Sequence, residues 1–323
     1  MAMSRAWVTA GIHPPLLLSL ALALPGVPRG YAADPPPQTK GVSSPDSRDS
    51  QPLYATSTRI DRTGRVLAPV FVNGHGPYRF ILDTGANRSA LGPHLVGLLG
   101  LAVAADVTVE VHGVTGSASL PAVQNVTLTA GEIVVNLARM PVLTPGILAD
   151  ADGILGIEGL ADARVEVDFE RDRVTVTRSH GERAPDGYLV VPVTLKNGGL
   201  LRTTARIGRV RAVAIVDTGA ERSLGNLALR EALLQRLPRH LKEKSATVLG
   251  ATQDVTEGTY FLSPKVLIGD AELNHLEITF GDLHVFRLWD AVDEPTIVIG
   301  MDLLGTAKQL AIDYRRREIQ IRP

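Results

Sequence analysis

Two aspartates end apolar stretches in nearly identical surroundings. The segment RFILDTGANRS covers residues 79–89 and VAIVDTGAERS covers 213–223, which places Asp83 and Asp217 134 positions apart. Six of the seven residues that start at each aspartate are the same in both segments. A single carboxylate at the end of a strand is usually a turn or cap residue. A repeated one indicates a shared chemical role for the pair.

Two carboxylates that lie close together can do chemistry that one cannot. They do not both ionise readily, so they share one proton and act together as a base and an acid. A water between them could lose a proton to one carboxylate while the other protonates or hydrogen-bonds a carbonyl oxygen. The pair therefore predicts amide hydrolysis with neither a metal nor a covalent intermediate.

The residues after each aspartate suit a rigid loop that holds its carboxylate. Thr84 and Thr218 offer hydroxyl groups for hydrogen bonds. Gly85 and Gly219 let another part of the backbone approach closely. If the two loops meet at a twofold-like axis, the carboxylates meet there as well. We predict the two aspartates as the catalytic pair and these four residues as their support.

The repeat extends beyond the aspartate motif and divides the chain into two halves. With the same offset of 134, Gly64 matches Gly198 and Gly74 matches Gly208, at places where short strands must turn. Further segments echo each other in the same order: 152–160 with 295–304, and 165–176 with 310–321. The sequence therefore predicts a duplicated domain, with halves at 53–180 and 181–323.

The stretch VLAPVFVNGHGPYRFILDTG, residues 66–85, shows how a half could position its aspartate. Apolar residues alternate and then run continuously around Asn73-Gly74, which is a favourable hairpin turn. We predict a hairpin whose second strand ends at Asp83.

Composition favours short strands and excludes some partners. The 323 residues are 45% hydrophobic and 4% aromatic, with 31 glycines between short apolar runs, which predicts a mostly β protein with packed cores. A net charge of −1 offers no field for nucleic acid or an anionic membrane. There is no cysteine, and the eight histidines lack metal-ligand spacing, so we expect no metal and no cofactor.

The first 32 residues have the pattern of a signal peptide. Arg5 precedes an apolar run at 16–24 that is too short to span a bilayer, and small residues up to Ala32 suit cleavage there. We expect an exported protein, periplasmic or secreted, with no stable membrane insertion after cleavage. An uncleaved anchoring tail remains the alternative. Residues 33–52 are rich in Pro, Ser and charge and predict a disordered linker.

The two Asp-Thr-Gly-Ala segments, each behind two apolar residues, resemble the active-site signature of retropepsin-like aspartic proteases of the bacterial type. ILG, which ends at Gly156, and VIG, which ends at Gly300, resemble the apolar segment that backs the catalytic loop in that family. The likeness covers residues 54 to 321. It implies two tandem closed β-barrel lobes related by a pseudo-twofold axis, fused as in pepsin, with the active site between them and Thr84 interlocked with Thr218.

The family also covers its cleft with hairpin flaps. Residues 109–120 and 247–260 have strand patterns broken by polar, Gly-rich turns and are the candidates. Ordinary surface hairpins would have the same pattern, so both interpretations stay open.

This chain departs from the family at a pair of charges that joins each catalytic loop to its backing segment. The family's acid after Asp-Thr-Gly-Ala and its arginine after the apolar-apolar-Gly segment do not both occur in either half of this chain. We hypothesise that exchanged pairs replace them, Arg88 with Glu158 and Arg222 with Asp302. Alternatively, both arginines face solvent.

These observations together predict a monomeric aspartic endopeptidase that hydrolyses peptides or unfolded proteins through Asp83 and Asp217. A catalytically inactive pseudo-protease that binds extended peptides in the same cleft is the alternative.

Overall fold

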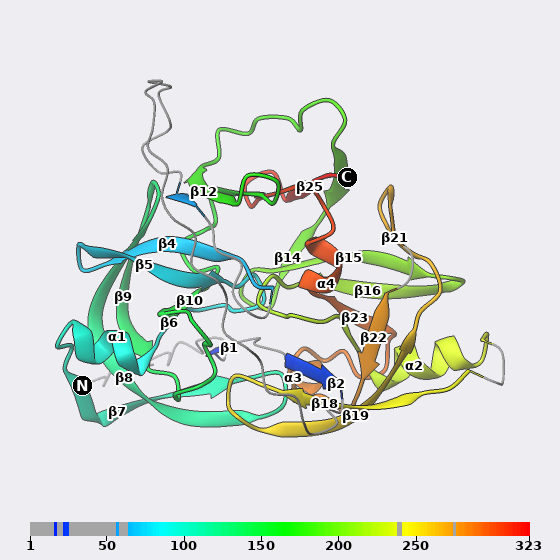
Figure 1. The fold of residues 1–323 in the computed structure, drawn as a ribbon, viewed down its shortest axis with the longest axis horizontal. Helices are drawn as coiled ribbons and strands as arrows, with labels where there is room; N and C mark the ends of the chain where they lie inside the picture. The colour runs from blue at the N-terminus through cyan, green and yellow to red at the C-terminus, as the bar shows by residue number, and fades with distance from the viewer. Residues whose placement is uncertain (1–15, 18–21, 26–55, 58–63, 238–240, 274–275) are drawn as a thin grey trace, which may run out of the picture.

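Strands dominate the structure. The computed structural model describes residues 16–17, 22–25, 56–57, 64–237, 241–273 and 276–323. Within these residues, 25 strands form three sheets and only four short helices are present (Figure 1). The prediction of a mostly β protein is confirmed.

The first sheet gathers strands from the first half of the chain, in the order β1, β7, β8, β4, β5, β10 and β6, with β9 paired to β8. The bounds are β1 Leu16–Leu17, β4 Leu67–Val72, β5 His75–Leu82, β6 Ala90–Leu91, β7 Val103–His112, β8 Ser117–Ala130, β9 Ile133–Pro141 and β10 Gly153–Leu155. The β4–β5 hairpin turns at Asn73 and Gly74, whose φ angles of 49° and 79° suit a two-residue turn. The predicted hairpin is therefore present, and β5 leads directly into Asp83.

The second sheet gathers strands from the second half, in the order β2, β18, β19, β22, β17, β23, β16, β15, β20 and β21, with β14 paired to β15. The bounds are β2 Leu22–Pro25, β14 Thr194–Lys196, β15 Leu200–Ile207, β16 Val210–Val216, β17 Leu224–Gly225, β18 Lys244–Leu249, β19 Val255–Leu262, β20 Val266–Ile268, β21 Ala271–Leu273, β22 Glu277–Phe280 and β23 Thr296–Ile299. Here β16 leads directly into Asp217.

The strands around the two aspartates pair in the same way. In the first half, β10 lies parallel to β5, with Ile154 opposite Ile81, and antiparallel to β6. In the second half, β23 lies parallel to β16, with Val298 opposite Ile215, and antiparallel to β17. Each aspartate therefore follows a strand that is flanked by its own apolar-Gly segment.

The third sheet joins the halves. Its order is β13, β25, β24, β11, β12 and β3. The bounds are β3 Thr56–Ser57, β11 Ala163–Asp168, β12 Arg173–Arg178, β13 Leu189–Pro192, β24 Gln309–Asp313 and β25 Glu318–Arg322. Strand β11 pairs with β24 antiparallel, with Val165 opposite Ile312. The end of the chain thus completes a sheet that the first half begins.

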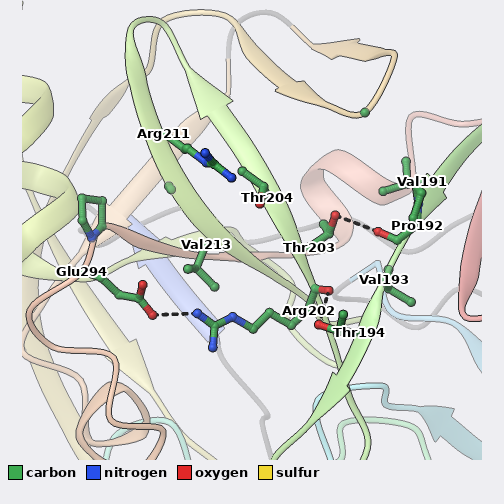
Figure 2. Close-up of a pocket in the computed structure, with 13 residues that line it drawn as sticks. Val191, Pro192, Val193, Thr194, Arg202, Thr203, Thr204, Arg211, Val213 and Glu294 are labelled. Atoms are coloured by element: carbon green, nitrogen blue, oxygen red, sulfur yellow. Dashed lines mark hydrogen bonds and ion pairs between the residues drawn. The ribbon is translucent and has the colours of Figure 1, made fainter.

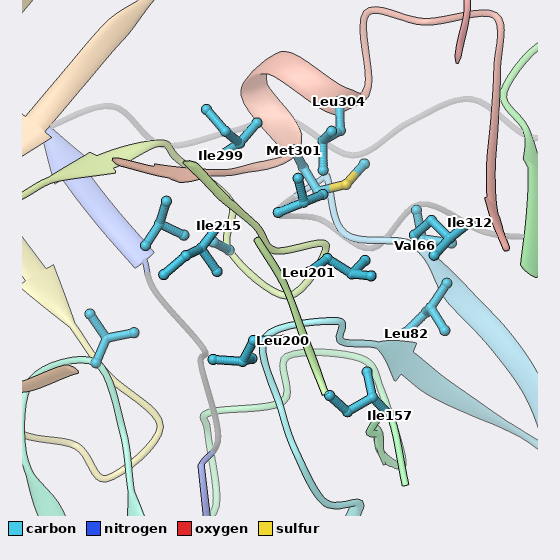
Figure 3. Packing of buried hydrophobic residues seen from close by; sticks show 14 of the residues in the cluster. Val66, Leu82, Ile157, Leu200, Leu201, Ile215, Ile299, Met301, Leu304 and Ile312 are labelled. Carbon is cyan, nitrogen blue, oxygen red and sulfur yellow. The ribbon is translucent and has the colours of Figure 1, made fainter. Parts of the chain in front are cut away.

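A large hydrophobic cluster extends through both halves. Figure 3 shows Val66, Leu82 and Ile157 beside residues of the second half such as Leu201 and Met301, and all five belong to the same buried cluster. The strand orders of the three sheets are open paths, so the described strands do not form the closed barrels that the family resemblance implies. The halves share a core and a sheet, and no closed barrel surrounds either half.

Helices are few and short: α1 Pro93–Leu98, α2 Leu227–Leu234, α3 His284–Leu288 and α4 Met301–Leu304. Among the described residues, no helix has the length and apolar character needed to cross a membrane. Of the proposed signal segment 1–32 only β1 and β2 are described. Strand β1 pairs with β7 and β2 pairs with β18. The proposed linker 33–52 lies outside the described residues.

Candidate active site

Strand ends bring the two aspartates into the buried centre of the molecule. The backbone N–H of Asp83 donates to the carbonyl of Leu155 at 3.0 Å, and that of Asp217 donates to Ile299 at 3.0 Å. Both aspartates are fully buried, with 0% of their surface exposed. Each is therefore fixed by the parallel strand that runs beside it.

The two threonines interlock the loops. The hydroxyl of Thr84 donates to the carbonyl of Val216 at 2.9 Å, and the hydroxyl of Thr218 donates to that of Leu82 at 2.6 Å. Each hydroxyl oxygen also accepts from the backbone N–H of the other threonine, at 3.0 and 3.1 Å. The interlocking that the family resemblance implies is present as four buried hydrogen bonds. Since each bond joins one half to the other, the loops cannot move apart without breaking them.

The carboxyl groups of Asp83 and Asp217 lie beside each other. Burial raises the pKa of Asp83 well above its ordinary value, and the negative charge of Asp217 and a hydrogen bond between the two side chains raise it further. Backbone N–H groups of Gly85 and Ala86 act in the opposite direction, because they donate to the ionised form. One proton held between the two groups is the arrangement that this environment favours.

Each carboxylate is also held from its own loop. Gly85 N–H donates to Oδ1 of Asp83 at 2.9 Å, and Gly219 N–H donates to Oδ1 of Asp217 at 2.9 Å. A Cβ atom placed on Gly219 would lie 2.2 Å from Cγ of Asp83. The absence of a side chain at Gly219 is therefore what lets the two loops bring their carboxyl groups together.

The apolar-Gly segments pass directly behind the aspartate loops. A Cβ on Gly156 would lie 2.5 Å from the carbonyl carbon of Arg88, and a Cβ on Gly300 would lie 2.7 Å from that of Arg222. The segments are bonded to the loops, since Ile157 N–H donates to the Ala86 carbonyl at 2.9 Å and Met301 N–H donates to that of Ala220 at 2.8 Å. The structure thus brings all eight predicted site residues into one assembly.

Serines, and not arginines, connect the loops to the acids of the backing segments. Ser223 donates through its N–H at 2.9 Å and its hydroxyl at 2.7 Å to the carboxylate of Asp302. In the first half, Ser89 N–H donates to Glu158 at 2.5 Å. Neither Arg88 nor Arg222 forms an ion pair among the described residues, so the predicted direct pairing is wrong, although each arginine lowers the pKa of the predicted acid from a distance.

The same serines accept from the backing glycines. Gly156 N–H donates to the Ser89 hydroxyl and Gly300 N–H donates to the Ser223 hydroxyl, both at 3.1 Å. Burial raises the pKa of Glu158 and of Asp302, while the bonds from the serines lower it in part. The recurrence of both serines within the repeated motif was the signal that could have identified them. Their hydroxyls reach these acids more directly than the neighbouring arginines, whose charges act only at a distance.

Tyr314 is a buried residue near the pair that sequence reasoning missed. It follows β24, is 3% exposed, and its hydroxyl has no hydrogen-bond partner among the described residues. Burial, and then the charge of Asp83, raise the pKa of this phenol. Tyr314 therefore stays protonated and adds no charge to the site. Nothing in its local sequence, which resembles an ordinary strand end, marked it.

The two candidate flaps are hairpins that approach the site. Strands β7 and β8 form one hairpin and β18 and β19 the other. Val111 of the first and Ala251 at the tip of the second belong to a buried cluster that also contains Ala86 of the first aspartate loop. Both hairpins thus pack toward the same side of the site.

A groove of about 780 Å³ lies elsewhere, between β13, β15 and β16 (Figure 2). Arg202 and Glu294 pair across it at 2.8 Å. None of the eight predicted site residues lines this groove. The described residues also contain no group of three or more His, Cys, Asp or Glu side chains placed to hold a metal ion.

A search of curated proteins gave no match to this chain. Residues 68–158 match the model of a family described as aspartyl protease. The matched range contains Asp83 and Gly156, whereas Asp217 lies outside it. The match shows that residues 68–158 are similar to aspartyl proteases.

Proposed function

We propose that this protein is an aspartic endopeptidase in which Asp83 and Asp217 activate water between two fused, retropepsin-like halves, 53–180 and 181–323. The observation that carries the proposal is the pair of carboxyl groups, buried side by side by loops that the threonines lock together. A buried carboxylate pair with a raised pKa costs stability, which is typical of a functional site.

The chemistry follows from one proton shared by two groups. The ionised carboxylate accepts a proton from a water molecule as the water oxygen attacks the carbonyl carbon of the substrate. The protonated carboxyl donates its proton to the carbonyl oxygen, which gives a neutral tetrahedral diol. When the diol collapses, the C–N bond breaks, the protonated carboxyl gives its proton to the amine nitrogen, and a diol hydroxyl gives its proton to the other carboxylate as it becomes the new carbonyl, so the pair again holds one proton. No external reagent other than water is consumed.

The proposed substrate is an extended peptide or an unfolded protein segment. Strand β7 of one hairpin accepts Leu16–Leu17 as a neighbouring strand, and β18 of the other accepts Leu22–Pro25. Both hairpins can therefore add a strand along their edges, which is a common way to bind an extended chain. A monomer suffices, because one chain supplies both aspartates.

Export remains a proposal that rests on the N-terminal pattern alone. We propose cleavage after Ala32, which would leave a mature protein that begins at residue 33. The mass of the protein recovered from outside the cytoplasm tests this. A mass that includes residues 1–32 would support the anchored alternative.

The test of the function is cleavage of a diverse peptide mixture by residues 33–323, with and without a transition-state-mimicking inhibitor of aspartic proteases. Asp83→Asn and Asp217→Asn should each abolish cleavage, because either change removes the paired acid and base. Asp270→Asn is the matched control, since Asp270 is exposed. Sedimentation shows whether the active species is a monomer. Binding of peptides without cleavage by the unaltered protein would refute the endopeptidase and favour a peptide-binding pseudo-protease.

A further inference from the structure

The tips of the two hairpins touch each other. Residues Gly113 to Gly116 form the tip of the β7–β8 hairpin, and the hydroxyl of Thr115 donates to the carbonyl of Asp254, at the tip of the other hairpin, at 2.7 Å. A Cβ on Gly250 would lie only 2.2 Å from Oγ1 of Thr115. In this structure the two hairpins are therefore closed against each other, along the lower edge of Figure 1.

A third element, α3, holds the first hairpin from the second half of the chain. The backbone N–H of Val285 donates to the carbonyl of Val114 at 3.1 Å. Two residues before Val114 lies His112 and one residue before Val285 lies His284, and Nδ1 of His112 and Nε2 of His284 are 3.2 Å apart. Because His112 ends β7 and His284 begins α3, this pair connects the flap of one half to a helix of the other.

The geometry of the two rings is that of a hydrogen bond. Their planes differ by 11° and their centroids are 5.5 Å apart. The distance between the ring centroids is longer than the 3.2 Å between the facing nitrogens by about the distance from centroid to nitrogen in both rings together. The two nitrogens therefore lie close to the line that joins the centroids, as in a hydrogen bond. One imidazole therefore donates an N–H to the lone pair of the other.

Such a bond depends on how many protons the pair carries. Nε2 of His112 lies 3.5 Å from the carboxylate of Glu110, which suits an N–H at Nε2 and a free lone pair at Nδ1. Nδ1 then accepts from His284. The pair can bind one additional proton and keep a hydrogen bond. With two additional protons both facing nitrogens carry hydrogen, and two positive charges face each other across the contact.

The charged groups around the pair are few. Glu110 faces His112 from the same strand, and Asp254 faces His284 from the tip of the second hairpin. Arg287 of α3 adds a positive charge and is itself paired with Asp282. Burial lowers the pKa of His284 below its ordinary 6.5, and the charges of His112 and Arg287 lower it further, while Asp254 raises it in part. The contact therefore disfavours protonation of His284.

We propose that His112 and His284 form a pH-sensitive latch, which keeps the β7–β8 hairpin closed on α3 near neutral pH and releases it in mild acid. Val111, which precedes His112, lies in the same buried cluster as Ala86 beside the catalytic loop. Release of the hairpin thus uncovers the side of the site to which both flaps pack. That last step, control of substrate access, rests on the proposed function, whereas the latch itself does not.

The direction of the pH dependence follows from linkage. In the open state His284 is solvated and titrates near its ordinary pKa of 6.5. In the closed state the pKa of His284 is lower, so the open state binds more protons between the two values. The closed state is therefore most stable above about pH 6.5 and loses stability progressively as the pH falls below it.

The test measures the distance between the hairpin and the region after α3, and needs no turnover. The chain has no cysteine, so spin labels at Ser119→Cys and Asp293→Cys, two exposed positions, attach there alone. We expect one short distance at about pH 7.5 and a longer, broader distribution at about pH 5. With His112→Gln and His284→Gln together, the short and long populations should no longer change with pH. His94→Gln, at an exposed histidine on α1, is the matched control and should behave like the unaltered protein.

Two outcomes would overturn the latch: an unaltered protein with the same distances at both pH values, or a double glutamine variant that still opens in acid. If the double variant folds poorly, amide exchange of Val285 in the unaltered protein decides instead. The reference is the amide of Thr279, whose N–H donates to the carbonyl of Ser223. From the higher to the lower pH, the protection factor of Val285 should fall by at least ten times as much as that of Thr279. Equal changes at the two amides would refute the proposal. A protein that opens as expected but cleaves no peptide would refute the endopeptidase and leave the latch intact.

Discussion

Replacement of Gly219 by alanine tests whether close approach of the two loops is what makes the carboxylates a pair. A Cβ at this position would lie 2.2 Å from Cγ of Asp83 and 2.4 Å from Oδ2, far below a normal contact. The backbone of Gly219 has no positive φ, so alanine introduces no strain of its own. The Asp83 carboxyl must therefore move, by about 1 Å, away from Asp217.

The expected cost falls on activity more than on stability. Displacement of a reacting group by about 1 Å can reduce a rate by about 100-fold, so kcat/KM should fall at least that far. Overpacking of a buried site costs about 1 to 3 kcal/mol of unfolding free energy. The pKa of Asp83 should also fall as its carboxyl moves away from Asp217, because their repulsion is one cause of its elevation. The acid limb of the pH–rate profile then shifts to lower pH.

Urea unfolding measures the change in unfolding free energy, and steady-state kinetics on the same preparations measure the change in kcat/KM. Gly97→Ala is the control, since nothing lies within 4 Å of a Cβ there. Gly97 is inside α1, so alanine should add about 0.5 to 1 kcal/mol of stability with unchanged kinetics. If Gly219→Ala retains kcat/KM within about tenfold of the unaltered protein, the close approach is not essential and the reasoning fails.

Three further predictions concern the loops around the pair. Ser223→Ala should lower the unfolding free energy by about 1 to 3 kcal/mol in urea titrations, because it leaves the buried Gly300 N–H without its acceptor. Ser117→Ala, at an exposed site, is the control and should change the unfolding free energy little. A double-mutant cycle on Arg222 and Asp302 should give a coupling below about 0.5 kcal/mol, and a larger value would mean that an ion pair forms in solution. Activity should peak in mildly acidic to near-neutral solution. Ala86→Ser should shift the acid limb of kcat/KM down by about one pH unit, since a hydroxyl donor stabilises the ionised form, and an upward shift would contradict this.

Local patterns were enough to predict the elements that carry the aspartates. Asn73-Gly74 between alternating apolar residues determines the β4–β5 hairpin, and the repeat implied that β16 would deliver Asp217 in the same manner. Gly156 and Gly300 were identified from their spacing and their resemblance to a known segment. In each case the signal lies within a few residues of the element, where turn chemistry and alternation act directly.

Features that depend on distant parts of the chain were not predictable in this way. Nothing in residues 163–168 indicates that they pair with residues 309–313, because strand pairing between remote segments leaves no local pattern. The shared sheet was therefore missed, and closed barrels were expected in its place. The choice of Ser89 and Ser223 over the arginines as partners of the acids depends on how deeply the loops are buried, which the sequence does not reveal.

The shared sheet has a consequence for the order in which the protein can be built during synthesis. The first half leaves the ribosome with one edge of β11 unpaired, and β24 covers that edge only when residues 309–313 have been made. The guanidinium of Arg164 likewise has no contact with Asp313 and Gln320, its partners at 3.5 and 3.0 Å, until those residues have been made. Until then the nascent chain presents an open strand edge, which is a template for wrong pairing with other chains. A protein that ends before residue 309 would keep that edge permanently, so aggregation is the expected fate of the first half made alone.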